Sequence, residues 1–143
     1  MPLYPDIDAT YQALPMEIGA RGLAYVHLID QSQFKVEGFQ SDTADTQKAF
    51  FDLLSSMRPA LQDTAVILAG GMTKAVAEDL IGRGEVDLVA FGSSFISNPD
   101  LVERLRHDWP LATARRETFY GGGVEGYVDY PPHTPVLPLS EDA

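Results

Sequence analysis

The chain contains no cysteine, which excludes disulfide bridges, thiolate metal sites and cysteine nucleophiles. This composition fits a reducing compartment, so we expect a cytoplasmic protein. Basic residues are also scarce, with 10 Lys and Arg against 21 Asp and Glu and a formal net charge of −11. Because nucleic acid is bound by a basic stripe and these few cations are scattered, we expect no nucleic-acid partner.

Long hydrophobic runs are absent too. No segment approaches the roughly 20 apolar residues that cross a bilayer, and the first residues lack the basic and apolar regions of a signal peptide, so we expect no membrane association. The 143 residues are 45% hydrophobic and 22% charged, which is ordinary for one globular domain. None of the three histidines has a second ligand at metal spacing, so no metal site is expected, and His27 is interpreted as a core histidine.

Short apolar runs alternate with segments of helical periodicity along the chain. The runs predict buried strands at Leu23–Ile29, Ala65–Ala69 and Val86–Phe91. The periodic segments predict four helices, at Ala9–Ala20, from about Thr43 to Arg58, after Thr73, and from Asn98-Pro99-Asp100. Thr73 is expected to be the N-cap of the third helix, and Asn98 the cap of the fourth, with Pro99 at its first position. This alternation implies βαβ units and a parallel sheet, and therefore an α/β fold. An open doubly wound sheet and a (β/α) barrel both fit the pattern.

Two of the predicted strands end in glycine, in Ala69-Gly70-Gly71 and in Phe91-Gly92-Ser93. Ligands of parallel α/β folds bind at this carboxyl edge, and glycines there let backbone N–H groups face a phosphate. The alternative is a pair of simple strand-to-helix turns. Neither sequence is a GxGxxG motif or a P-loop. No acid, base or nucleophile stands out, so no catalytic residue is assigned.

The segment Thr118–Pro131 combines three consecutive glycines with flanking aromatic residues. Glycines allow sharp turns or close approach, and flat side chains such as Tyr120 can wall a pocket for a planar ligand. The alternative interpretation is a structured tail that is pinned by buried aromatic residues.

Three blocks of the chain resemble, in the right order, the old yellow enzyme family of FMN-dependent NADH/NADPH:alkene oxidoreductases, which includes N-ethylmaleimide reductase-like proteins. The blocks are Arg21–His27, Val66–Gly92, and Ile96–Leu101 with the later Thr118–Pro131. The resemblance implies a (β/α)8 TIM barrel, of which this chain supplies the C-terminal part: three strands with four helices and a tail. It divides the chain into a lead-in over residues 1–8, the barrel part over 9–131, and a flexible tail over 132–143.

The resemblance also implies a cofactor site. FMN binds the family's barrel at the carboxyl ends of its strands, and a family tyrosine at the position of Tyr120 lies against the flavin and substrate. The positions that match the loops around the flavin phosphate are Ala69, Gly70, Gly71, Gly92 and Ser93.

Two departures from the family's pattern limit what the chain can do alone. The family usually has an arginine at the position of Ser93, and its absence should weaken FMN binding by ~1.5–3 kcal/mol. The family's tyrosine proton donor and its His/His or His/Asn substrate pair match nothing in this chain. We therefore expect weak or no FMN binding by the isolated chain, and catalysis on NAD(P)H and an activated alkene only in a completed barrel.

A three-stranded piece of a barrel leaves open sheet edges and apolar surface. We therefore expect the chain to associate with a second copy or with a complementary barrel half. The alternative to an enzyme is a non-catalytic truncated or split-gene half-barrel that keeps the phosphate cradle and binds another chain.

Overall fold

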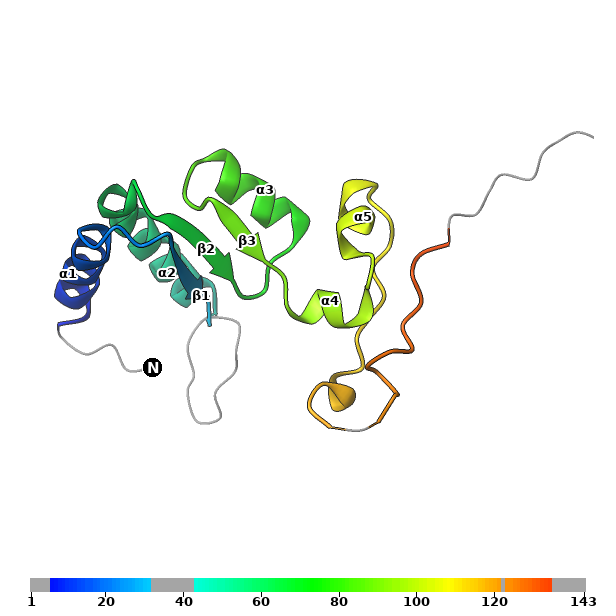
Figure 1. Cartoon of the computed structure of the whole chain (residues 1–143). Helices are drawn as coiled ribbons and strands as arrows, with labels where there is room; N and C mark the ends of the chain where they lie inside the picture. Colours follow the sequence, from blue (N-terminus) through cyan, green and yellow to red (C-terminus); the bar gives the residue numbers. More distant parts are fainter. Residues whose placement is uncertain (1–5, 32–42, 122, 135–143) are drawn as a thin grey trace, which may run out of the picture. The chain divides into compact units, whose positions relative to one another are not determined.

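The computed structural model describes residues 6–31, 43–121 and 123–134. It consists of two compact units, 1–90 and 91–143, which are described separately below. The elements of the first unit are α1 (Ile7–Gly19), β1 (Tyr25–Ile29), α2 (Thr43–Met57), the 3-10 helix η1 (Arg58–Leu61), β2 (Ala65–Ala69), α3 (Lys74–Gly82) and β3 (Leu88–Ala90) (Figure 1). Those of the second unit are α4 (Ser93–Ser97), α5 (Leu101–Arg106) and the 3-10 helix η2 (Arg116–Thr118).

The three strands form one parallel sheet in the order β1-β2-β3 (Figure 1). Each connection between neighbouring strands contains a helix, because parallel neighbours cannot be joined by a hairpin. The parallel α/β arrangement predicted from the sequence is therefore confirmed. Strand β2 has the predicted limits, whereas β1 and β3 begin two residues later than expected.

The late start of β3 has a local cause at Asp87. Its backbone N–H donates to the carbonyl of Val66 over 2.9 Å, and its carboxylate accepts the N–H of Val66 over 2.7 Å. The same carboxylate forms an ion pair of 2.8 Å with Arg58, which also donates to the carbonyls of Gly84 and Leu61. A side chain thus replaces a ladder carbonyl at this point, and Arg58 ties η1 to the sheet.

All three long helices pack on one face of the sheet. The apolar residues of that face in β2, Val66 and Leu68, are fully buried. The core around them contains Leu54, Met57, Leu61, Leu80 and Val86, with Tyr11, Ile18, Val26, Leu28, Phe50, Phe51, Leu53, Met72 and Val89 packed against it. Helix α1 is continuous through Pro15, which is buried.

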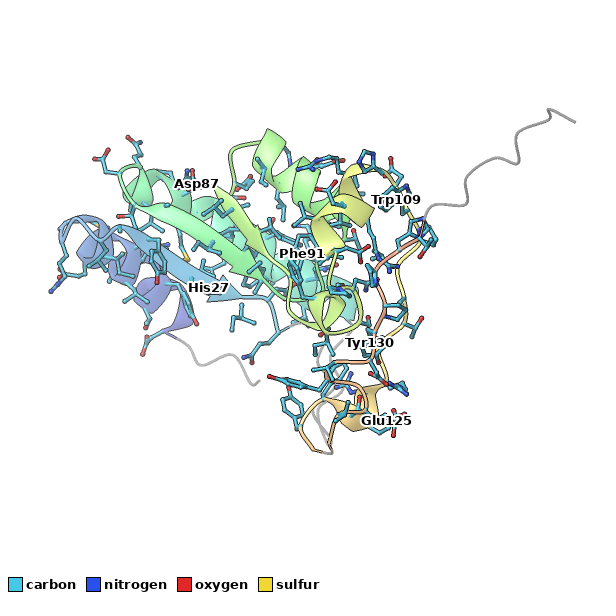
Figure 2. The ribbon with its side chains drawn as sticks, turned by 45° about the vertical axis from the view of Figure 1, so that its right-hand side comes forward. His27, Asp87, Phe91, Trp109, Glu125 and Tyr130 are labelled. Atoms are coloured by element: carbon cyan, nitrogen blue, oxygen red, sulfur yellow. The ribbon has the colours of Figure 1, made fainter. Side chains whose placement is uncertain are left out.

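The opposite face of the sheet is uncovered in the described part of the chain. Tyr25, His27 and Ile29 alternate along β1 with half-buried neighbours, and Leu88 of β3 is exposed as well. The strand register places His27 beside Ile67 and Ile67 beside Leu88, so these residues share one face. The interpretation of His27 (labelled in Figure 2) as a core residue is therefore wrong for this structure, because its face has no covering layer.

The sequence pattern did not indicate α4, so the described residues contain five α-helices rather than four. Asn98 was expected to cap the helix that follows it, yet α5 begins at Leu101 with Asp100 at its N-cap. Asn98 instead ends α4, where its side chain donates to the carbonyl of Ser94 over 2.8 Å. The sequence predicts a polar loop at Gln31–Gln40, and all of it except Gln31 lies outside the described part of the chain.

Gly70 is closely packed at the carboxyl edge of the sheet. Its φ is +107°, and a Cβ atom there would lie 2.2 Å from the carbonyl oxygen of Asp30. We expect Gly70→Ala to lower the free energy of unfolding by about 1–3 kcal/mol, since it adds both backbone strain and a clash. Urea denaturation followed by far-ultraviolet circular dichroism measures this.

Gly82→Ala is the matched control for that substitution. Gly82 ends α3 without a positive φ, and nothing lies within 4 Å of a Cβ built there. Alanine should leave stability unchanged or raise it by up to about 1 kcal/mol. Equal effects of the two substitutions would contradict the close packing of Gly70.

Candidate functional site

The candidate phosphate cradle begins where β2 ends. Ala69 pairs with Ile29 on one side and with Ala90 on the other, so the three strands end at the same edge. Gly70 and Gly71 follow with positive φ values of 107° and 56°, which glycine adopts without strain. The glycines thus turn the backbone sharply at this edge, as the sequence suggested.

Helix α3 follows this turn after two residues. The hydroxyl of Thr73 accepts the N–H of Val76 over 3.3 Å, which confirms Thr73 as the predicted N-cap. A group bound at the turn would therefore lie near the beginning of a nine-residue helix, where backbone N–H groups favour an anion.

The second glycine turn belongs to the second unit. Gly92 is the N-cap of α4 and Ser93, its first residue, is exposed. Nothing lies within 4 Å of a Cβ built at Gly92, so the backbone there is open to a group that approaches it. The chain reaches Gly92 from Ala90, the last residue of β3, through Phe91.

A buried polar cluster around Asn98 fixes the segment that follows α4. The Asn98 amide donates to the carbonyl of Ala112 over 3.2 Å and accepts its N–H over 2.8 Å. The hydroxyl of Ser97 donates to the same carbonyl over 2.7 Å. Because Asn98 and Ser97 are almost completely buried, these bonds satisfy groups that would otherwise be costly to bury.

A second cluster joins α5 to residues 131–134. Arg104 is buried and donates to Asp100 over 2.7 Å, and to the carbonyls of Pro110 and Pro131 over 2.8 and 3.2 Å. The other oxygen of Asp100 accepts the N–H of His133 over 2.6 Å. The flexible tail was expected to begin at residue 132; within it, His133 makes one of these contacts, and residues 135–143 lie outside the described part.

Trp109 adds an aromatic contact to this junction (Figure 2). Its ring stacks on His107 at 4.9 Å between centroids and lies 4.5 Å from the ring of His133. These three aromatic side chains therefore connect the end of α5 with the segment around His133.

Arg115 organises the tail segment that carries Tyr120. Its guanidinium forms ion pairs of 2.9 Å with Glu125 and 2.6 Å with Asp129, and its central carbon lies 5.2 Å from the centre of the Tyr130 ring. Figure 2 labels Glu125 and Tyr130. Its backbone N–H donates to the Tyr130 hydroxyl over 2.8 Å. The hydrogen bond with Asp129 raises the pKa of Arg115 above its usual value, and its counterpart lowers the pKa of Asp129.

The aromatic residues of this segment are mostly exposed. Tyr120 is 99% exposed and Tyr127 is 83% exposed, whereas Tyr130 is half-buried under Arg115. The interpretation of a tail pinned by buried aromatic residues is therefore wrong for Tyr120 and Tyr127. A polar cluster holds the segment instead, and no local sequence signal announced Arg115, because its partners follow 10 to 15 residues later.

The structure therefore divides the predicted cofactor residues between its units. The first unit contains Ala69, Gly70 and Gly71, which are consecutive. The second unit contains Gly92 and Ser93 at the beginning of α4, and the exposed Tyr120 after η2. Within the described ranges, no three His, Asp or Glu side chains are grouped so that they could hold a metal ion. Nor does any helix among them combine the length and apolar character needed to cross a membrane.

Comparisons with known proteins place this geometry in a larger fold. No family model matches the sequence. The chain is 39% identical over 111 residues to the putative 12-oxophytodienoate reductase 11 of Oryza sativa subsp. japonica, with 77% of this chain and 28% of the relative covered. Among solved structures, morphinone reductase in complex with tetrahydroNAD has a TM-score of 0.72 and 30% identity, with 99% and 33% of the two chains covered. The old yellow enzyme from Trypanosoma cruzi has a TM-score of 0.71 and 31% identity, with 92% and 32% covered.

The parallel sheet and these similarities identify the fold as part of a (β/α) TIM barrel. In sequence and fold, the chain corresponds to the C-terminal part of the old yellow enzyme family, as its three sequence blocks predict. The chain spans about 28% of the length of the first curated relative and about a third of the solved structures.

Acid should destabilise the two polar clusters in which Asp100 binds Arg104 and Asp129 binds Arg115. Burial opposes the ionisation of Asp100, but hydrogen bonds from Arg104 and from the N–H of His133 lower its pKa below the ordinary 3.8, and Asp129 is lowered as well. A carboxylate with a lowered pKa stabilises the folded state above its unfolded-state pKa and loses that contribution as the pH falls through the folded value. We expect the second unit to lose stability below about pH 4.

Urea titrations at pH 5 and pH 2.5, followed by the fluorescence of the single tryptophan, Trp109, measure this loss. Asp129→Asn should reduce the difference, and the exposed Glu117→Gln should keep it. The same difference in wild type and Asp129→Asn would contradict the role of Asp129.

Proposed function

We propose that the chain supplies the FMN-phosphate cradle of an old yellow enzyme-type oxidoreductase that reduces activated C=C bonds with NADH or NADPH. The cradle consists of Ala69, Gly70, Gly71, Gly92 and Ser93, and Tyr120 is the residue that lies against the flavin ring. When bound, FMN supplies the hydride transfer between nicotinamide and alkene.

The observation that carries this proposal is the shared edge of β2 and β3. Ala69 and Ala90 are paired, and each strand continues into a glycine-containing turn within two residues. Ligands of TIM barrels bind at this carboxyl edge, and the loops after the last two strands commonly hold a phosphate. The sequence resemblance independently assigns the flavin phosphate to the same residues.

The residues present fit a phosphate group. The positive φ values of Gly70 and Gly71 turn the backbone at the edge, and Gly92 leaves room for a close approach. The donors are backbone N–H groups and the exposed hydroxyl of Ser93, whose chemistry suits a phosphate oxygen. What this set lacks is a guanidinium that could bind two phosphate oxygens at once.

The role of this chain is binding and orientation rather than proton transfer. The described loops at this edge offer no tyrosine or histidine pair in the roles that the family uses for substrate binding and protonation. Those roles belong to the part of the relatives that this chain does not span. Turnover therefore requires a completed barrel.

The alternative function is a non-catalytic half-barrel that associates with another chain. The observation in its favour is the uncovered sheet face, where Tyr25, Ile29 and Leu88 are each more than half exposed. Both β1 and β3 also have one edge without a paired strand among the described residues. Exposed edges and apolar faces favour association, here with a second copy or a complementary barrel half.

Titration of FMN fluorescence with the purified chain tests the cradle. We expect weak quenching by the wild type and an affinity about tenfold or more higher for Ser93→Arg, because the guanidinium adds a charge-assisted phosphate contact. Ser56→Arg, at an exposed position of α2, adds the same charge elsewhere and should have no effect. No quenching by either the wild type or Ser93→Arg would refute the cradle.

Sedimentation velocity tests the association. We expect a species larger than the monomer, and a shift toward monomer in Leu88→Lys, which places a charge on the uncovered face. Val102→Lys in α5 is the matched control, since both side chains are 54% exposed. A monomeric wild type that binds no dye specific for apolar surface would rule out the association.

A further inference from the structure

The loop that carries Tyr120 is closed at its base by one arginine. We call residues 116–121 and 123–129 the aromatic loop. Arg115 precedes it, and Asp129 and Tyr130 mark its end. Arg115 reaches three points of the returning chain, through Glu125, Asp129 and the hydroxyl of Tyr130. The two ends of the aromatic loop are therefore joined by side-chain contacts rather than by a sheet or a helix pair.

The contacts of the loop form a closed chain of interactions. The hydroxyl of Thr118 donates to the carbonyl of Arg115 over 2.8 Å. Gly126 passes so close to Thr118 that a Cβ there would lie 2.0 Å from the Thr118 hydroxyl oxygen. The N–H of Gly126 donates over 2.7 Å to one oxygen of Asp129, and the other oxygen binds the Arg115 guanidinium. Together these contacts form a ring that begins and ends at Arg115.

Besides this ring, the described part of the loop has short backbone turns, such as the one in which the N–H groups of Tyr127 and Val128 both donate to the carbonyl of Val124 over 3.1 Å. Most of its large side chains are exposed, with Val124, Val128 and Tyr127 each more than 60% exposed and Phe119 half-buried. Its regular structure is limited to η2, which has three residues. Without an apolar interior, a loop of this length keeps one conformation only if polar contacts offset its conformational entropy.

We propose that Arg115 is a positioning residue: its contacts with Glu125, Asp129 and Tyr130, which we call the clamp, fix the shape of the aromatic loop and so present Tyr120 before a flavin binds. The choice of a flavin as the ligand rests on the proposed function, whereas the closure of the loop rests on the contacts of Arg115. A preformed loop spares the binding step the entropy of ordering, so loss of the clamp should weaken ligand binding without removing any group that touches the ligand.

Arginine suits this position better than lysine would. Its planar fork binds two carboxylates at separate nitrogens while its face lies over the Tyr130 ring. A lysine has the same charge but only one nitrogen, so it cannot hold Glu125 and Asp129 in the same way. Arg115→Lys therefore separates the geometry of the clamp from its charge.

Hydrogen exchange of the full 143-residue chain, measured by mass spectrometry, tests the clamp directly. We expect peptides covering the aromatic loop to exchange about tenfold faster in Arg115→Gln, and nearly as fast in Arg115→Lys, because the N–H groups of Arg115 and Gly126 lose their fixed partners. Peptides covering β2 and α5 should exchange as in the wild type. Arg116→Gln, at the exposed neighbouring position, is the matched control and should change nothing.

Two further measurements extend this test. Asp129→Asn removes the ion pair between Asp129 and Arg115. The double variant with Arg115→Gln should exchange no faster than Arg115→Gln alone, because both residues act in one network.

In FMN titrations, Arg115→Gln and Arg115→Lys should bind FMN about fivefold more weakly than the wild type does, and Arg116→Gln should bind it equally well.

The outcomes distinguish this proposal from the function on which its ligand depends. Wild-type exchange rates in Arg115→Gln would overturn the clamp, whatever FMN does. Faster exchange with unchanged FMN affinity would overturn the positioning role and leave the phosphate cradle standing. A wild type that binds no FMN would overturn the proposed function, and the exchange rates alone would then decide whether Arg115 holds the loop.

Discussion

The parallel pairing of β2 with both of its neighbours is the constraint on which the first unit depends. Val66 and Leu68 of β2 are fully buried and form the surface on which α2 and α3 pack. The same pairing brings the carboxyl ends of β2 and β3 to one edge, because the last residues of the two strands, Ala69 and Ala90, are paired with each other. Packing and the candidate cradle therefore have a common origin: a strand that lost its register would disturb the core and the glycine turns at once.

The uncovered sheet face follows from the same strands. Their sequences are apolar at nearly every position, as in strands buried on both faces, yet helices cover one face only. In a full TIM barrel, side chains from all the strands fill the interior that such a face lines. Tyr25, His27, Ile29 and Leu88 are thus residues suited to a barrel interior that this chain, at about a third of the length of its solved relatives, does not enclose by itself.

The sequence predicted features whose cause is local and missed those whose cause is distant. Strand β2 and the cap at Thr73 were predicted correctly because an apolar run between turns and a hydroxyl before a helix act within a few residues. Helix α4 has only five residues, too few for a periodic pattern to emerge. Asn98 binds Ala112, and Arg115 binds Asp129, each 14 residues away. Such contacts depend on the path of the loop, which no short pattern encodes.

Charge sets a last condition on the candidate cradle. The chain carries a formal net charge of −11, so a phosphate dianion approaches it against a long-range repulsion. Salt of about 0.15 M screens that repulsion beyond roughly 8 Å, so the outcome depends on contacts at the site itself. At the position of Ser93 the resemblance implies an arginine, so the proposed contacts come from backbone N–H groups and a hydroxyl, which are neutral donors. Backbone N–H groups point toward a phosphate only while the turns keep their shape. The packing of Gly70 against Asp30 is therefore more important for phosphate binding in this chain than it would be beside a guanidinium.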